Sequence, residues 1–326
     1  MERRQFIQTM VVGASIASSG AWAQTNNWPD KPIKLVLSQP AGSGPDNVAR
    51  LLGDRLAKSL GQPLVIDNKP GGQNVIGAQA AARSTPDGYT FYFATTAALI
   101  TNTLLFKQLA YDPQKEFVPV AFVARSPFAI LVDANSPIQN IDDLIAKSKA
   151  SNGQFSIGNE GPRTFSGMIA RLFNARSKAA ANLVPYASVG VGSQNLMGGH
   201  VDASIVALQT AAPHLQNGAL RMLALMSAER SPAFPNVPTL KELGVANGVV
   251  ETWYGVFVPA GTPAEVVAKL NADINSLLQL PEVKDTMNKQ GLVIVGGKPE
   301  RLNDLVKNEL SRWARVVEKA GIKADN

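Results

Sequence analysis

Short apolar runs alternate with amphipathic stretches along most of the chain. Residues 34–38 form an apolar run suited to a strand that is covered on both faces. Beyond a turn rich in Gly and Pro, apolar positions recur at helical spacing up to residue 60, and Gly61 marks the helix end. The same order continues with a strand at 63–69, a helix at 75–83 and a strand at 89–94. This alternation predicts a parallel sheet with right-handed crossovers.

The rest of the chain repeats the pattern. Strands are expected at 118–124, 129–132, 155–157, 201–207, 221–226, 252–258 and 292–295. Helices are expected at 142–151, 165–175, 211–217, 263–278, 281–290 and 300–320. Thr164 stands where one of these helices begins, and Thr210 is expected to cap the helix at 211–217.

These elements group into two α/β lobes. The first lobe is expected to comprise residues 24–124 and 228–326, with the second lobe, residues 125–227, inserted into it. Strands at 118–125 and 220–227 are the predicted crossings between the lobes. Several loops that contain glycine then face one cleft, which is where ligands bind in such sheets.

The loop that joins the first strand to the first helix is a candidate anion site. It contains Pro40, Gly42, Gly44 and Pro45. Its glycines allow a sharp turn, and N–H groups at a helix start favour an anion. The loop lacks the Gly-Lys-Ser/Thr end of a phosphate-binding loop, and Asn47 replaces the third glycine of a dinucleotide fingerprint. Asp46 is either the helix N-cap or an acceptor that faces a ligand, and a plain turn without a ligand is the alternative.

Composition narrows the function classes. The chain has 326 residues, a formal net charge of +6 and dispersed basic residues, which argues against nucleic-acid binding. It contains no cysteine, so disulfides and a cysteine nucleophile are excluded. His200 and His214 lack the pattern of a metal site, and we expect neither a metal nor another cofactor.

The first residues resemble an export signal. Arg3 and Arg4 precede a weakly apolar stretch, and Ala21-Trp22-Ala23 has the small-x-small form of a cleavage site. We therefore expect residues 1–23 to be a signal peptide, cleaved after Ala23, and the mature protein to be periplasmic. The two arginines also resemble a twin-arginine signal, with ordinary Sec export as the alternative.

Several motifs, in a fixed order, resemble the periplasmic receptors of tripartite tricarboxylate transporters, the Bug-type receptors. They include Pro40-Ala-Gly-Ser-Gly-Pro-Asp46, Asp67-Asn-Lys-Pro-Gly-Gly72, Thr85-Pro-Asp-Gly-Tyr-Thr90, Leu196-Met-Gly-Gly-His-Val-Asp202 and Val258-Pro-Ala-Gly-Thr-Pro263. The resemblance covers essentially the whole mature chain. It implies a two-lobe type II periplasmic binding protein of the Venus flytrap kind, with two strands crossing the hinge.

The resemblance also implies a function. Such a receptor binds a small carboxylate between its lobes and delivers it to a small and a large membrane subunit. We expect a monomer. The ligand-binding residues carried over to this chain are Ser43, Gly44, Asp46, Thr95, Thr96, Asn159, Gly161, Arg163, Thr164, Ser188 and Gln209.

The chain departs from the family in these same regions. Pro45 replaces the usual threonine, and Ala207 and Gln209 stand near a position that is often aspartate. Arg163 is a candidate for bidentate binding of a second carboxylate, although an exposed loop arginine is the commoner case. The identity of the carboxylate is therefore left open.

Two other function classes share some of these sequence features. A receptor that passes its signal to a partner, such as a sensor kinase, fits the same sequence features. An exported hydrolase is the least favoured, because Gly-x-Ser-x-Gly is absent and only two histidines exist. The sequence thus predicts a binding protein and not an enzyme.

Overall fold

The computed structural model describes residues 28–161, 164–186, 188–245 and 249–319. Within these residues one mixed sheet of ten strands runs through both lobes. The strands are β1 (Ile33–Leu37), β2 (Leu64–Asn68), β3 (Thr90–Thr95), β4 (Phe117–Asp133), β5 (Ser156–Asn159), β6 (Asn182–Pro185), β7 (Ala203–Ala207), β8 (Leu220–Leu225), β9 (Glu251–Pro259) and β10 (Val293–Ile294). The expected strands are present, with shifts of a few residues at their ends, except that those at 118–124 and 129–132 are parts of one strand; β6 was not predicted.

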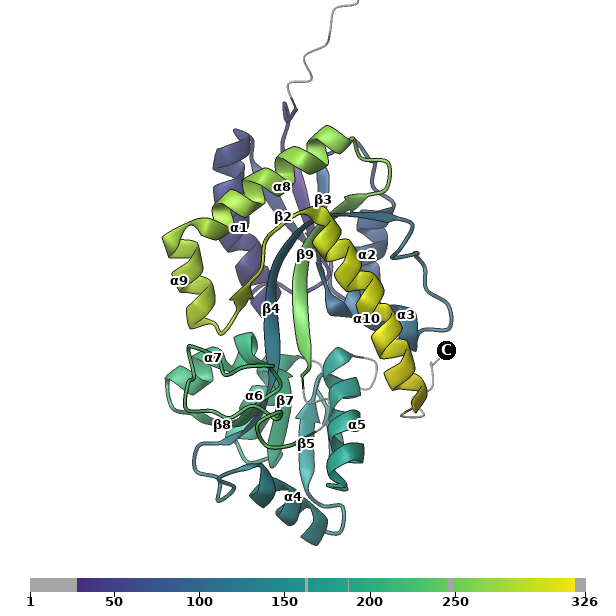
Figure 1. Cartoon of the computed structure of the whole chain (residues 1–326). Helices are drawn as coiled ribbons and strands as arrows, with labels where there is room; N and C mark the ends of the chain where they lie inside the picture. Colours follow the sequence, from purple (N-terminus) through teal and green to yellow (C-terminus); the bar gives the residue numbers. More distant parts are fainter. Residues whose placement is uncertain (1–27, 162–163, 187, 246–248, 320–326) are drawn as a thin grey trace, which may run out of the picture.

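Helices cover both faces of this sheet (Figure 1). They are α1 (Gly44–Leu60), α2 (Val75–Ala82), α3 (Asn102–Leu105), α4 (Ile141–Ala150), α5 (Phe165–Ser177), α6 (Val189–Met197), α7 (Leu208–Gln216), α8 (Ala264–Gln279), α9 (Pro281–Lys289) and α10 (Pro299–Lys319). Two short helical turns, Gly72–Asn74 and Ala97–Thr101, complete the described elements. The turn at Ala97–Thr101 and α3 were not predicted. No helix of the described residues is long and apolar enough to span a membrane.

The first lobe is built on the parallel strands β1, β2 and β3, with β9 antiparallel to β3. Successive residues of β1 point to opposite faces. Leu35 packs with residues of α1 and α8, whereas Val36 joins the core on the other face with residues of α2 and α10. This two-sided burial explains why the strand reads as an unbroken apolar run.

The second lobe repeats this design with shorter strands. β5 is parallel to β6 and β7, and β4 is antiparallel to β7 and β8. Residues of α4 and α5 pack on one face, whereas residues of α6 and α7 form a separate apolar cluster on the other. In both lobes the parallel strands end at one edge, so the loops that follow them gather there.

One long strand, β4, joins the lobes (Figure 1). The two strands predicted at 118–124 and 129–132 are a single strand, whose partners change from β9 and β10 to β7 and β8 along its length. Pro119 and Pro127 concealed this continuity, because proline removes a donor from the ladder. Register shifts between Pro119 and Ala121 and between Phe122 and Ala124 accommodate the irregularity.

The second predicted crossing, at 220–227, is wrong. β8 ends at Leu225 and pairs with Ala129–Asp133, in the part of β4 that belongs to the second lobe. The strand that runs beside β4 toward the first lobe is β9, paired from Glu251 to Pro259. The exact lobe boundaries inferred from the sequence remain our proposal.

The two threonines expected at helix starts have different outcomes. Thr164 is the N-cap of α5, and its side chain accepts a hydrogen bond from the N–H of Gly167. Thr210 is not a cap, because α7 begins two residues earlier with Ala207 at its N-cap position. The Thr210 hydroxyl donates instead to the carbonyl oxygen of Ala207. A hydroxyl inside the first turn thus satisfies a backbone acceptor rather than an N–H group.

Candidate functional site

The loops that follow β1, β2 and β3 are tied together by one amide. Gln39 Nε2 donates to Asn74 Oδ1 at 2.9 Å and to Thr95 Oγ1 at 3.2 Å. Gln39 Oε1 is shielded from solvent and has no hydrogen-bond partner among the described residues. Gln39 therefore keeps one acceptor available at the edge of the sheet where ligands bind in α/β folds.

The start of α1 carries a polar side chain whose hydrogen bonding is incomplete. Ser43 is its N-cap, with φ −71° and ψ 161°, and Gly44 and Pro45 form the first turn. Ser43 Oγ makes no cap hydrogen bond and has no partner among the described residues. Proline is well tolerated in the first turn, where its missing N–H has no intrahelical partner to lose. An unpartnered hydroxyl thus lies at the positive end of the helix dipole.

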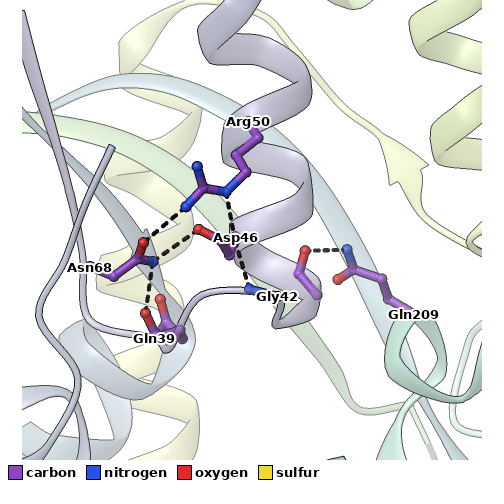
Figure 2. A network of polar contacts seen from close by, with 7 residues as sticks. Gln39, Gly42, Asp46, Arg50, Asn68 and Gln209 are labelled. Carbon is purple, nitrogen blue, oxygen red and sulfur yellow. Dashed lines mark hydrogen bonds and ion pairs between the residues drawn. The ribbon is translucent and has the colours of Figure 1, made fainter. Parts of the chain in front are cut away.

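Asp46 is not the N-cap of α1, and its carboxylate is bonded within the first lobe (Figure 2). It follows the N-cap by three residues, and it is only 1% exposed. Its Oδ2 accepts from the N–H of Gly42 and from Arg50 Nε, both at 2.8 Å. Its Oδ1 accepts from Asn68 Nδ2 at 2.9 Å. The carboxylate reaches back to the loop in the manner of a capping box and fixes the turn before α1.

These contacts keep Asp46 ionised. Burial by itself raises the pKa of a carboxyl group, but the hydrogen bonds from Arg50, Asn68 and Gly42 outweigh that effect. The pKa of Asp46 therefore lies below its usual value. Asn68 also donates to the carbonyl oxygen of Gln39 at 3.0 Å, so one network holds both ends of the loop.

The two threonines after β3 differ in availability. Thr95 is buried, and its Oγ1 accepts from Gln39. Thr96 is fully buried, and its Oγ1 accepts from the N–H of Trp253 at 2.9 Å and contacts Thr252 Oγ1 at 3.2 Å. Thr96 thus anchors the start of β9, whereas Thr95 belongs to the Gln39 cluster.

The second-lobe loop after β5 is folded on itself. Asn159 Oδ1 accepts from the N–H of Gly161 at 2.8 Å. Thr164 Oγ1 donates to the carbonyl oxygen of Gly161 at 2.8 Å and caps α5. Asn159, Gly161 and Thr164 are therefore brought together as predicted neighbours. Arg163 lies outside the described residues.

Ser188 lies one strand further along the second lobe. It is the N-cap of α6, and its Oγ accepts from the N–H of Val191 at 3.3 Å. It is exposed, and no hydrogen bond among the described residues joins its side chain to the loop after β5. The predicted second-lobe residues thus lie at two neighbouring helix starts rather than in one cluster.

Glu160 is a chemically distinctive residue that the sequence did not single out. Desolvation raises the pKa of this glutamate to about 7, although its side chain is only partly buried. Its charge in turn helps to raise the pKa of Tyr254, after the larger effect of burial. Glu160 of the second lobe and Tyr254 of the first therefore lie within electrostatic reach of each other.

Gln209 connects the lobes directly. It is 4% exposed, and its Nε2 donates to the carbonyl oxygen of Gly44 at 2.7 Å (Figure 2). The same nitrogen is 3.2 Å from Gln290 Oε1, and Tyr254 donates its hydroxyl proton to Gln209 Oε1. Gln209 was expected to contact a ligand, and in this structure its side chain bonds instead to the first lobe.

The residues missed by sequence reasoning share one property. Gln39 and Tyr254 contact the predicted residues Thr95 and Gln209, and Asn74 contacts Gln39, but side chains of these types are common in ordinary loops and strands. Gln39 stands two residues after the end of β1, so the strand-end rule that selected Thr95 would have found it. No group of three His, Asp or Glu side chains suited to a metal ion occurs among the described residues.

A separate cavity of about 420 Å³ lies between α5, α10 and the residues Met226, Leu240, Val245 and Val250. Its walls are mostly apolar and include Ile169, Phe173, Met226, Val250 and Trp313. None of the predicted site residues that the structure describes lines it. The polar strand ends and this apolar cavity are therefore distinct features of the molecule.

Two lobes on one sheet, with polar loops meeting where they face each other, define the class of solute-binding receptors. Solved structures agree with this class. The structure of Rpa4515 of R. palustris with adipate has a TM-score of 0.87 and 31% sequence identity, covering 91% of this chain and 100% of that one. MatC of Rhodopseudomonas palustris with bound malate has a TM-score of 0.82 and 31% identity, covering 89% and 100%.

The family is also clear from the sequence comparisons. Residues 48–322 match the model of the tripartite tricarboxylate transporter family receptor. Protein BugT of Bordetella pertussis is 34% identical over 316 residues, which are 96% of this chain and 97% of BugT. The chain belongs to the tripartite tricarboxylate transporter family of receptors, and it is a solute-binding protein rather than an enzyme.

Proposed function

We propose that this receptor binds a small carboxylate between its lobes. The observation that carries the proposal is Ser43 Oγ, a hydroxyl without a partner among the described residues at the N-cap of α1. A carboxylate placed there would accept from Ser43 and from first-turn N–H groups, at the positive end of the helix dipole. Adipate and malate, bound by the two related proteins, are both small carboxylates.

Residues from both lobes would surround the ligand. From the first lobe we propose Ser43, Gly44 and Thr95 as contacts, with Asp46 and Thr96 holding their backbone in place. The second-lobe contacts proposed are Asn159, Gly161, Arg163, Thr164 and Ser188. Because contacts from two lobes form together only when the lobes close, ligand binding would shift the receptor toward its closed form.

Glu160 gives the site a pH-dependent character. Its pKa of about 7 keeps a large fraction protonated at neutral pH, and a protonated carboxyl group can donate to a ligand oxygen. Ionisation of Glu160 would instead repel an anion. We therefore expect a carboxylate ligand to bind more tightly at pH 6 than at pH 8.

Delivery to a membrane transporter completes the proposal. The family description names a tripartite tricarboxylate transporter, so we propose its small and large membrane subunits as partners. We also propose that the protein is exported to the periplasm. The predicted signal peptide, residues 1–23, lies outside the described residues.

A thermal-shift screen tests the carboxylate proposal. Residues 24–326 would be heated with mono-, di- and tricarboxylates and with aromatic acids. A carboxylate present at 100 times its dissociation constant should add about 2.7 kcal/mol to the free energy of unfolding. A screen in which only uncharged or cationic compounds raise the melting temperature would refute the proposal.

A matched pair of serine variants tests the contact itself. Ser43→Ala removes the unpartnered hydroxyl and should weaken binding of the selected carboxylate about fivefold to tenfold. Ser276→Ala removes an exposed hydroxyl that bonds only within α8, and binding should not change. Calorimetry measures both affinities. Equal affinity of Ser43→Ala and the unmodified chain would exclude Ser43 from the ligand contacts.

A further inference from the structure

The contact between α7 and the first lobe is built on two glycines. A Cβ atom at Gly44 would lie 2.9 Å from Cδ and Oε1 of Gln209. A Cβ atom at Gly291 would lie 2.4 Å from Cδ2 of Leu208. Two consecutive side chains of α7 therefore fill space that exists because these positions of the first lobe lack side chains.

The spaces beside Gly44 and Gly291, here called sockets, are filled by side chains of different polarity. Leu208 is fully buried and contributes apolar contact at Gly291. Gln209 is 4% exposed and contributes hydrogen bonds at Gly44, Gln290 and Tyr254. A buried amide costs free energy if its partners are withdrawn, so these bonds favour one relative position of the lobes.

Tyr254 fixes the orientation of the Gln209 amide. Burial raises the pKa of the Tyr254 hydroxyl above its usual value, so the group stays protonated at any physiological pH. It donates to Gln209 Oε1, which directs Nε2 toward the oxygen atoms of Gly44 and Gln290. The backbone N–H of Gln209 is itself held by Ser126 Oγ of β4 at 3.3 Å.

We propose that Leu208 and Gln209 form a latch that closes the lobes without ligand. Gln209 is then a positioning residue, because its amide forms its hydrogen bonds with the first lobe. The latch sets the fraction of ligand-free receptor that is closed. Only its expected effect on ligand affinity rests on the proposed function. A receptor that is closed in advance loses less affinity to the conformational change.

Fluorescence energy transfer on ligand-free protein tests the latch. The chain has no cysteine, so Lys58→Cys in α1 and Lys149→Cys in α4 provide unique, exposed labelling sites in the two lobes. Gln209→Ala should raise the ratio of open to closed molecules by roughly tenfold to hundredfold, the loss expected for two or three buried hydrogen bonds. An unchanged transfer efficiency would overturn the proposal.

Two further variants separate the latch from a general loss of stability. Gly44→Ala blocks one socket from the opposite lobe, and Gly44 lies in the first turn of α1 rather than at a positive φ. It should open the lobes as Gln209→Ala does. Gln216→Ala removes an exposed bond from α7 to the carbonyl oxygen of Lys289 and should leave the ratio unchanged. Opening by all three variants would show that the whole seam, and not the latch, holds the lobes.

Because these measurements need no ligand, the latch and the carboxylate proposal fail independently. If no carboxylate binds but Gln209→Ala opens the lobes, the latch stands and the ligand class is wrong. If a carboxylate binds and the unmodified ligand-free chain is fully open, the latch is wrong and the ligand class stands.

Discussion

Two seams join the lobes, and they differ in chemistry. The polar seam consists of Leu208, Gln209 and Gln216 of α7 against Gly44, Tyr254 and the segment 289–291. The apolar seam consists of α5 against α10. At its centre the rings of Phe165 and Trp313 meet edge to face, with centroids 4.9 Å apart. The two seams bring the same two lobes together by different forces.

The difference teaches how such a receptor can be stable and yet move. Hydrogen bonds are directional, so the polar seam is either formed or broken. Apolar contact is non-directional, and a cavity of about 420 Å³ leaves the apolar seam incompletely packed. We infer that the apolar seam supplies most of the free energy of contact, whereas the polar seam selects the closed geometry.

The largest expected effect is at the apolar seam. Trp313 is 1% exposed, and Trp313→Ala should lower the free energy of unfolding by about 3–5 kcal/mol, measured by urea denaturation. Trp313→Phe keeps an aromatic ring against Phe165 and loses the bond from Nε1 to Glu309 and part of the buried ring volume, so it should cost less than half as much. Equal losses would mean that the indole hydrogen bond, not ring burial, dominates this seam.

The second effect concerns the loop that supports the polar seam. Asp46→Asn removes a buried charge bonded to Arg50 and Gly42, and should cost about 1.5–3 kcal/mol at pH 7. Since the folded-state pKa of Asp46 is depressed, this stability is present above the unfolded pKa of about 3.9 and is lost as pH falls further. Urea denaturation from pH 3 to pH 7 should show the variant and the unmodified chain converging at low pH.

Asp54→Asn is the control for that measurement, because Asp54 is exposed on the same helix. It should change the free energy of unfolding by less than about 0.5 kcal/mol at any pH. If Asp54→Asn reproduced the pH dependence of Asp46→Asn, the effect would come from the charge of α1 as a whole and not from the loop network.

Much of the fold followed from the sequence, because strand and helix periods differ and alternate clearly. The continuity of β4 did not, since Pro119 and Pro127 are residues that usually interrupt ladders. The second crossing was misplaced for a related reason. β8 and β9 are similar apolar runs, and only their partners, Ala129–Asp133 against Phe117–Pro127, tell them apart.

For the candidate site, the sequence predicted only the residues that follow from one rule, that ligand-binding side chains lie at the ends of parallel strands. That rule placed Thr95 and Asn159 at the correct edge of the sheet. It gave no indication that Gln209 bonds to Gly44, because the two residues are 165 positions apart and no local pattern links them. The burial of Asp46 among three donors was likewise invisible, since an aspartate near a helix start reads equally well as a cap.

The third effect concerns Glu160, which lies outside both seams and acts electrostatically on Tyr254 of the polar seam. The pKa of Glu160, about 7, lies above its unfolded value of about 4.3, so the folded state binds more protons and loses stability as pH rises between these values. Because the side chain is only partly buried, solvent screening limits the loss to about 1–2 kcal/mol between pH 5 and pH 8. Glu160→Gln should remove this loss in urea denaturation.

Glu229→Gln, at an exposed glutamate outside both seams, should leave the pH dependence intact. The cost of Trp313→Ala should be the same at pH 5 and pH 8, because ring burial does not titrate. Two results would contradict the assignment of this pH dependence to Glu160. One is a cost of Trp313→Ala that changes with pH, and the other is a loss of stability between pH 5 and pH 8 that persists in Glu160→Gln.

The smallest effect tests whether the apolar seam is loosely packed. Val250 lines the cavity, so Val250→Ile adds one methylene to space that is already present and should raise the free energy of unfolding by about 0.5–1 kcal/mol. Val258→Ile adds the same group to a fully buried position that does not line the cavity, where overpacking should cost about 1–3 kcal/mol. Opposite signs in urea denaturation would sharpen the comparison, since only an incompletely filled seam gains from added volume. Two destabilised variants would show that α5 and α10 are packed as tightly as the core, and the polar seam would then have no looser counterpart.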